Sequence, residues 1–372
     1  MSNRLSHSAT GRFMQCPTSY DLHYNKRLRS TKSKAALMFG TSLDKSVSAI
    51  LEGESLENAE KIFEQYWTNQ YVNGKQENLA TLESLVYAKA DFDEEMISEI
   101  GWIALECNKE EVLNLIERRS KEGFDALSPD QKMIVNHAFW WSMHAKGMLM
   151  LKVFKNKVLT RLKKIHSTQE EVSLENGDGD SIIGFIDLVA DVEGYDTPVI
   201  LDLKTSARSY NEEEAVIYSP QLSLYLNAVG NKYKTRKCGY IVLNKAIIKN
   251  RKKICSICNY NGSSGRAKTC DQETLQIIEG KKGPTEKMVR CNGIWNETLD
   301  PDIYVQFLVD EIPEATENLV LDNIDDINQA IKNNVYTKNL SMCLNFFGGK
   351  CDHIEYCYRG KMDGLMIAEE KK

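Results

Sequence analysis

The sequence predicts an α/β fold in which helices flank a central mixed β-sheet, with a helical N-terminal part and a cysteine-rich insertion. Three observations favour this class. Apolar residues recur at helical spacing through the first third of the chain. The middle of the chain holds short apolar runs, alternating or continuous, of the kind that form buried strands. Between residues 251 and 295, cysteines, glycines and lysines interrupt both patterns.

The N-terminal third is expected to be mostly helical. Residues 8–24 carry aromatic and thiol side chains at helical spacing, and the periodicity continues over residues 36–51 and 56–71. The stretch Ser128-Pro129-Asp130 is typical of a helix start. It leads into a periodic segment that runs to about residue 162.

A β-hairpin is expected after this helical part. Residues 170–174 alternate, residues 176–180 read Asn-Gly-Asp-Gly-Asp as in a hairpin turn, and residues 182–192 return as the antiparallel partner. The elements expected after the hairpin are a strand at 199–203, a helix at 212–229, a strand at 239–243 and a helix from 302 to about 333.

Size and composition limit the possible classes of protein. With 372 residues and 42% hydrophobic content, the chain can bury a large core. Its net charge of -6 argues against a general electrostatic nucleic-acid binder, so any DNA contacts must come from local basic patches and metal. No stretch approaches eighteen consecutive apolar residues, and the first residues lack the apolar segment of a signal peptide. We therefore expect a cytoplasmic protein (host cytoplasm if phage-encoded) with no membrane partner.

Two aspartates and a lysine lie in the apolar runs of the predicted sheet. Strands have a period of two, so Asp202 and Lys204 point to one face. Burying such charges costs several kcal/mol unless they are paired or hold a metal. Magnesium prefers hard oxygen ligands, which Asp187, Asp202 and the carbonyl of Leu203 offer. The pattern predicts a Mg²⁺ or Mn²⁺ site for phosphodiester hydrolysis, with Lys204 orienting the attacking water or stabilising the developing charge.

These residues resemble the RecB-like exonuclease branch of the PD-(D/E)xK nuclease superfamily. The matching pieces are Gly184-Phe185-Ile186-Asp187, Asp202-Leu203-Lys204-Thr205 and, on the following helix, Gln221-Leu222-x-x-Tyr225. The resemblance implies a restriction-endonuclease-like core, metal ligation by Asp187 and Asp202, and a catalytic role for Lys204. It also implies DNA or active-site contacts from Gln221 and Tyr225.

Two further acidic positions are assigned by the same resemblance. Glu170, with Glu171 as the neighbouring alternative, is similar to the outer glutamate of the site. Phe39-Gly40-x-x-x-Asp44 resembles the helix that carries a metal-binding histidine in this branch, and Asp44 stands in its place. Asp44 is either a ligand for Mg²⁺ or Mn²⁺ or a surface residue. Because that histidine accompanies exonuclease behaviour, the choice between exonuclease and endonuclease stays open.

The resemblance pairs Cys16, in Ser8-Ala9-Thr10-x-x-Phe13-x-x-Cys16-Pro17, with three distant cysteines. Iron-sulfur members of the branch hold a four-iron four-sulfur (4Fe-4S) cluster with one N-terminal and three C-terminal thiolates, here Cys343, Cys351 and Cys357. The spacing of Cys343 and Cys351 is longer than in several relatives. The alternatives are zinc held by the three C-terminal cysteines with His353, or ordinary buried thiols.

A second cysteine set lies inside the insertion. Cys255 and Cys258 form a Cys-x-x-Cys knuckle, which Cys270 and Cys291 can complete to a tetrahedral Zn²⁺ site. The insertion has too few apolar residues to fold alone, so metal would supply much of its folding free energy. A redox-active Cys-x-x-Cys pair is the rival interpretation, but no thioredoxin-like pattern surrounds it.

The sequence thus predicts a metal-dependent DNA nuclease, most simply an exonuclease, in recombination, repair or phage DNA processing, with a helicase or recombination protein as a possible partner. The alternatives are a non-catalytic DNA-binding scaffold with the same fold and a restriction-type endonuclease. The parts expected along the chain are a helical part at 1–165, the nuclease core at 166–250, a zinc-binding insertion at 251–295 and a C-terminal helix with the cysteine cluster at 296–372.

Overall fold

The computed structural model describes residues 4–72, 74–175, 181–211, 214–262, 269–270, 272–280, 283–344 and 349–369. The chain divides into two compact units. We name them the core unit, Met1–Lys245 with Val305–Lys372, and the ribbon unit, Ala246–Tyr304. The predicted hairpin turn at 176–180 lies outside the described residues.

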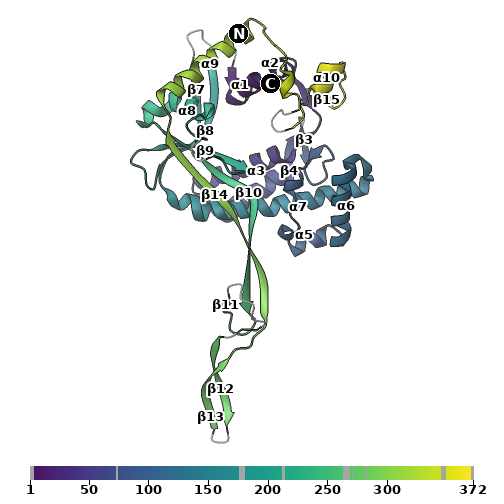
Figure 1. Ribbon diagram of the computed structural model, residues 1–372, viewed down its shortest axis with the longest axis vertical. Coiled ribbons are helices and arrows are strands. Elements are labelled where there is room, and N and C mark those ends of the chain that lie inside the picture. Colours follow the sequence, from purple (N-terminus) through teal and green to yellow (C-terminus); the bar gives the residue numbers. More distant parts are fainter. Residues whose placement is uncertain are drawn as a thin grey trace. The chain divides into compact units, whose positions relative to one another are not determined.

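A mixed β-sheet forms the centre of the core unit, as predicted (Figure 1). Strand β8 pairs in parallel with β1 and antiparallel with β7 and β9, whereas β9 pairs in parallel with β10. Strand β14 adds to β10, and β11 pairs with the far end of β10. The strands of this sheet are β1 (Arg4–Ser6), β7 (Leu162–Glu175), β8 (Ser181–Val192), β9 (Val199–Ser206), β10 (Lys237–Cys255), β11 (Asn261–Gly262) and β14 (Trp295–Glu311).

The helices lie mainly before β7, in agreement with the predicted helical N-terminal part. Side chains cap their starts: Ser128 and Gln131 form a reciprocal capping box on α7, and Ser55 caps α4. The described helices are α1 (His7–Gln15), α2 (Pro17–Tyr20), α3 (Ala35–Leu51), α4 (Leu56–Thr68), α5 (Glu99–Ala104), α6 (Lys109–Glu122), α7 (Pro129–Val153), α8 (Pro220–Tyr233), α9 (Glu314–Lys332) and α10 (Ile354–Arg359).

Short strand pairs tie distant segments of the core unit together. Strand β15 pairs antiparallel with β2, and β3 pairs in parallel with β6. The bounds of the small strands are β2 (Leu28–Ser30), β3 (Ser33–Lys34), β4 (Asn69–Val72), β5 (Lys75–Asn78), β6 (Leu85–Val86) and β15 (Leu365–Ile367). In the ribbon unit, β12 (Glu273–Gly280) and β13 (Gly283–Arg290) form an antiparallel pair.

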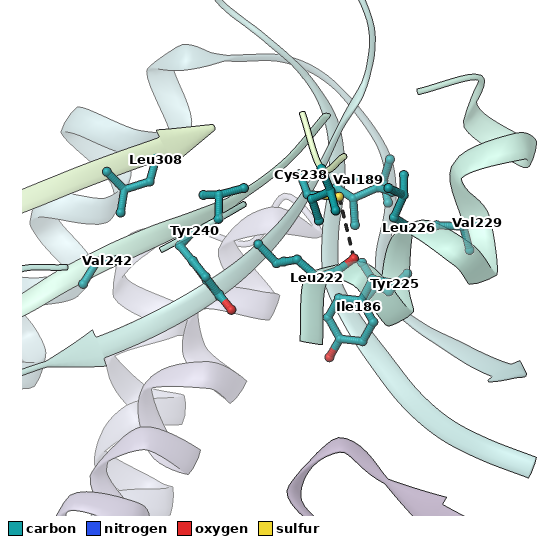
Figure 2. Close-up of a cluster of buried hydrophobic side chains, with 13 residues drawn as sticks. Ile186, Val189, Leu222, Tyr225, Leu226, Val229, Cys238, Tyr240, Val242 and Leu308 are labelled. Carbon is teal, nitrogen blue, oxygen red and sulfur yellow. Dashed lines mark hydrogen bonds between the residues drawn. The ribbon is translucent and has the colours of Figure 1, made fainter. Parts of the chain in front are cut away.

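Helix α8 covers one face of the central sheet. Figure 2 shows its apolar residues Leu222, Leu226 and Val229 packed among sheet residues that include Val189 and Cys238. The buried thiol of Cys238 donates to the carbonyl of Leu222 over 3.8 Å. Apolar residues of α3 lie against the other face, where Val47 and Leu51 meet Leu188, Leu201 and Ile241. The sheet is therefore buried on both sides where the acidic residues lie.

Two predicted helices differ from the structure. The segment from residue 302 is not helical up to 333: residues 295–311 form β14, and α9 begins only after Pro313. Pro313 cannot sit inside a helix, and pairing with β10 satisfies the backbone of the preceding residues. The helix predicted at 212–229 begins at Pro220, after the Ser219 N-cap. None of the helices in the described ranges is long and apolar enough to cross a membrane.

Candidate active site

Strands β8 and β9 separate at the position of two aspartates. Their ladder covers Leu188 to Ala190 on β8, opposite Val199 to Leu201 on β9. Asp187 and Asp202 follow directly at the open end. The amide of Leu203 donates to Oδ2 of Asp187 over 2.7 Å. The side chain of Asp187 therefore holds the diverging strands together where the ladder has ended.

Asp202 belongs to a hydrogen-bonded network with α8. Its Oδ1 accepts from Nε2 of Gln221 over 2.7 Å, and its Oδ2 lies 2.7 Å from Nζ of Lys204. Nζ of Lys204 donates to Oε1 of Gln221 over 2.8 Å. The hydroxyl of Tyr225 lies 2.8 Å from Nε2 of Gln221 and donates to the carbonyl of Phe185 over 2.7 Å. Gln221 thus fixes the aspartate and the lysine relative to each other.

Asp44 lies on the other side of Asp187. Nε2 of Gln169 is 3.2 Å from Oδ1 of Asp44 and 3.2 Å from Oδ1 of Asp187, and so bridges the two carboxylates. A cavity of about 10 Å³ lies among these three side chains and the apolar residues between α3 and the sheet. That volume is on the order of one water molecule. Asp44 is therefore half-buried and lies close to Asp187, with Gln169 between the two carboxylates.

Burial and mutual repulsion change the ionisation of the two central aspartates. Burial, then the charge of Asp202, raises the pKa of Asp187 to about 7. Burial also raises the pKa of Asp202, although the Lys204 ammonium opposes the shift. For Lys204, burial opposes the charged form, but Asp202 outweighs it, and the pKa of Lys204 lies above its ordinary value. Lys204 is therefore a cation at neutral pH.

The structure does not bring Glu170 to this group. Glu170 pairs with Ile186 in the hairpin register and so faces α8, where Lys232 donates to its Oε1 over 2.7 Å and Tyr233 to its Oε2 over 2.6 Å. Its neighbour Glu171 is exposed. The carboxylate of Glu170 is held at the far end of α8 from Gln221.

Gln169 takes the place at the site that was predicted for Glu170. The sequence pattern had not indicated Gln169 as a site residue. It has a positive φ of 47°, which is uncommon for a residue other than glycine. The sequence held one signal for Gln169. In an antiparallel hairpin, the residue opposite Asp187 lies as many residues before the turn as Asp187 lies after it. An amide that bridges two carboxylates also reduces their repulsion.

The donor types at this site suit a divalent cation, although among the described residues only the cysteines of the ribbon unit have all their donor atoms within 4.8 Å of one another. Asp44, Asp187 and Asp202 are hard oxygen donors of the kind that Mg²⁺ and Mn²⁺ prefer. Oδ2 of Asp202 is fully buried and accepts no hydrogen bond of good geometry, although it is ion-paired with Lys204. Asp202 is buried, whereas Asp44 and Asp187 are half-buried, and carboxylates withdrawn from water are costly unless each is paired with a cation. The backbone amide of Leu203 donates a hydrogen bond to Asp187, and Leu203 also lines the cavity.

The four thiols of the ribbon unit converge on one point. Sγ of Cys255 is 3.5 Å from Sγ of Cys291, and Sγ of Cys258 is 3.6 Å from Sγ of Cys270. All four lie within 4.8 Å of one another. Tetrahedral zinc with bonds of about 2.3 Å needs sulfurs about 3.8 Å apart. Burial opposes ionisation of Cys255, but the amides of Cys258 and Ile257 outweigh it and lower its pKa to about 6.

The thiols of Cys16, Cys343, Cys351 and Cys357 line one cavity of about 300 Å³ in the core unit. Within the described residues, only the ribbon-unit group has all its donor atoms within 4.8 Å, so these four thiols are more widely spread. Both nitrogens of His353 are engaged, Nδ1 with Ser19 at 3.3 Å and Nε2 with the carbonyl of Leu28 at 3.1 Å. A zinc site completed by His353 does not fit this arrangement.

Comparison with known proteins agrees with this geometry. A family model of the PD-(D/E)XK nuclease superfamily matches residues 4–358. The chain therefore belongs to the PD-(D/E)XK nuclease superfamily, whose nucleases typically use divalent metals and whose fold implies DNA as the substrate. A search of the curated proteins finds no match to this sequence.

Proposed function

We propose that the protein is a metal-dependent DNA exonuclease of the RecB-like branch, with Asp187 and Asp202 as the metal ligands and Lys204 as the catalytic cation. The observation that carries the proposal is the network in which Gln221 holds Asp202 and Lys204 together beside Asp187 at the open end of β8 and β9. A non-catalytic scaffold would have no need of a half-buried lysine fixed at this place.

When bound, Mg²⁺ or Mn²⁺ supplies a hydroxide near neutral pH and neutralises charge on the reacting phosphate. Asp187 and Asp202 hold the cation, with Asp44 as an outer ligand and the carbonyl of Leu203 as a further oxygen. Lys204, a cation at neutral pH, binds a phosphate oxygen and stabilises the charge that develops on it, and does not act as a base. Gln221 and Tyr225 position these groups.

The two cysteine sets supply structural cofactors in this proposal. Zn²⁺ bound by Cys255, Cys258, Cys270 and Cys291 stabilises the ribbon unit, which has few buried apolar residues. A 4Fe-4S cluster bound by Cys16, Cys343, Cys351 and Cys357 joins α1 and α2 to the segment that holds α10. The functional parts are then a helical part at 1–165, the catalytic core at 166–250, the zinc insertion at 251–295 and the cluster-bearing part at 296–372.

Digestion of three DNA forms tests the proposal: linear single-stranded, linear double-stranded and closed circular. We expect Mg²⁺- or Mn²⁺-dependent release of nucleotides from linear DNA only, and loss of activity in Lys204→Ala and Asp202→Asn. Lys61→Ala is the matched control, because Lys61 is an exposed lysine paired with Glu57 on α4. Cleavage of circular DNA would show an endonuclease. Intact DNA of every form, with both metals supplied, would overturn the assignment.

The biological setting belongs to the proposal too. An enzyme that shortens DNA from an end acts in recombination, repair or phage DNA processing, and a helicase or recombination protein would deliver its substrate. Copurification with such a protein, compared between the wild type and Lys204→Ala, tests this part separately from catalysis.

A further inference from the structure

An apolar groove lies between α1, the start of α8 and α9 in the core unit. Its volume is about 200 Å³, and its walls include Met14, Tyr218, Leu224, Leu319, Val320 and Asn323. Tyr218 is 67% exposed and Leu319 is 67% exposed, so the groove is open to solvent. None of its described lining residues is acidic.

The groove lies next to the candidate active site along α8. Pro220 and Leu224 line the groove, whereas the next residues in the helix, Gln221 and Tyr225, belong to the hydrogen-bonded network that holds Asp202. Residues one position apart lie on adjacent faces of a helix. The start of α8 therefore separates the groove from the reacting centre by the width of one helix face.

Helix α1 also carries residues near both the groove and Lys204. His7, Thr10 and Met14 are spaced so that they share one face of α1. Thr10 and Met14 line the groove, and His7 lies near enough to Lys204 to be affected by its charge. Nδ1 of His7 is buried and has no hydrogen-bond partner. This face of α1 thus runs from Lys204 into the groove.

We propose that this groove binds a nucleobase of a single-stranded segment of DNA, next to the phosphodiester that the active site cleaves, and that Tyr218 stacks on the base. The inference rests on the proposed nuclease function. A base has two apolar faces and a polar edge, which match the apolar walls, the exposed aromatic ring and the amide of Asn323. The described lining has neither acidic nor basic side chains, so the groove would hold the base and leave the phosphates to groups outside it.

Stacking is sequence-tolerant, because every base has a flat π-face. The site would therefore hold the strand without selecting a sequence, as an enzyme that degrades successive nucleotides requires. A paired base keeps its faces against its neighbours and cannot enter, so the groove would favour single-stranded over double-stranded ends.

Fluorescence of 2-aminopurine placed at each position near the end of a single-stranded oligonucleotide tests the proposal. Binding is measured in the Lys204→Ala background, where no cleavage interferes. We expect quenching at one position, its loss in Tyr218→Ala with binding about 5- to 150-fold weaker, and its retention in Tyr218→Phe. Tyr71→Ala is the matched control, because Tyr71 is 75% exposed on β4 and does not line the groove.

An abasic nucleotide at the quenched position provides the second measurement. It should weaken binding to the Lys204→Ala protein and make no difference when Tyr218→Ala is added, since the partner of the base is then already absent. Leu319→Glu should weaken binding as well, because it places a negative charge beside the strand. It leaves the residues of the active site unchanged.

The possible results distinguish a failure of the base-binding groove from a failure of the proposed nuclease function. If quenching depends on Tyr218 but the wild-type protein cleaves no DNA, the groove is supported and the proposed function is refuted. Cleavage with unchanged quenching and affinity in Tyr218→Ala would refute the groove alone. A Tyr218→Ala protein that changes from dimer to monomer and still binds DNA normally would also refute it, because the groove would then be covered by a second copy of the chain.

Discussion

Nζ of Lys204 donates to the side-chain oxygen of Gln221 over 2.8 Å, while the amide nitrogen of the same glutamine donates to Asp202 over 2.7 Å. The lysine and the aspartate are thus joined by a direct ion pair and by one uncharged side chain that contacts both. An ion pair alone leaves the long lysine side chain free to change its rotamer relative to the aspartate. The glutamine, held on the first turn of α8, removes that freedom.

Gln221→Ala should therefore lower kcat by about 10- to 100-fold, the usual cost of losing a group that orients a ligand. Initial rates on linear DNA over a range of metal concentrations would measure it. The matched control is Asn136→Ala, a buried amide on α7 whose Nδ2 donates to the carbonyl of Leu82. We expect the control to lose stability and keep kcat. Equal loss of kcat in the two variants would contradict the positioning role.

The stability of the metal-free protein should fall as the pH rises. The pKa of Asp187 is about 7 in the folded protein and near its ordinary value of about 4 in the unfolded chain. The folded state thus binds the proton more tightly, so this contribution is fully present below pH of about 4 and is lost as the pH rises through about 7. Thermal unfolding from pH 5 to pH 8 should show it, and Asp187→Asn should reduce the slope.

Added Mg²⁺ should reverse this trend, because the cation binds the ionised carboxylates. We expect little increase in Tm at pH 5 and a clear increase at pH 8, where binding to the folded state stabilises it in proportion to its saturation. An increase in Tm that is the same at both values of pH would indicate that the cation binds elsewhere.

Asp44→Ala should weaken metal binding by about 10- to 100-fold without unfolding the protein, because Gln169 would still contact Asp187. Asp44→His should restore binding with a stronger preference for Mn²⁺ over Mg²⁺, since imidazole suits transition metals better. Titration of both cations, followed by calorimetry, measures the two effects. Unchanged affinity in Asp44→Ala would show that Asp44 is not a ligand.

Purified protein should contain one zinc per chain, and Cys258→Ser should lose it. Because the ribbon unit is a separate compact unit, we expect protease cleavage within 246–304 to accelerate in the variant while the core unit stays intact. Elemental analysis and limited proteolysis give both results. Cys107→Ser, which changes a cysteine outside both sets, is the control.

Anaerobic purification should yield protein that contains iron, and Cys351→Ala should lose the iron and keep the zinc. The reason is that the thiols in the cavity between α2 and α10 are too widely spread for one tetrahedral ion. Metal analysis with visible absorbance distinguishes the two sets. Zinc in place of iron at these cysteines would contradict the cluster.

The sequence predicted the parts of this protein that depend on short-range pattern. Alternating apolar residues located β8 and β9, and helical spacing placed Gln221 and Tyr225 on one face. Gln169 was missed, because its position depends on the register of two strands and on an unusual backbone conformation. The part of β14 from residue 302 was mistaken for helix because its partner, β10, ends 40 residues before β14 begins.

The two cysteine sets also show that spacing along the chain does not give distances in the folded protein. Spacing along the chain groups Cys255 with Cys258, but it does not reveal how far apart the sulfurs of Cys16 and Cys351 lie. Only the folded core unit shows that those thiols line one cavity and that they are more widely spread than the thiols of the ribbon unit.

The contacts of His353 with Ser19 and with Leu28 span 334 and 325 residues, and β15 pairs with β2 beside them. These are among the most non-local contacts that such a chain can make, and contacts of this kind form late and slowly in folding. During synthesis, Ser19 of α2 and Leu28 of β2 meet His353 only after more than 300 further residues have left the ribosome. A destructive enzyme assembled in this order would remain harmless as a nascent chain and would become competent only when translation of that segment is complete.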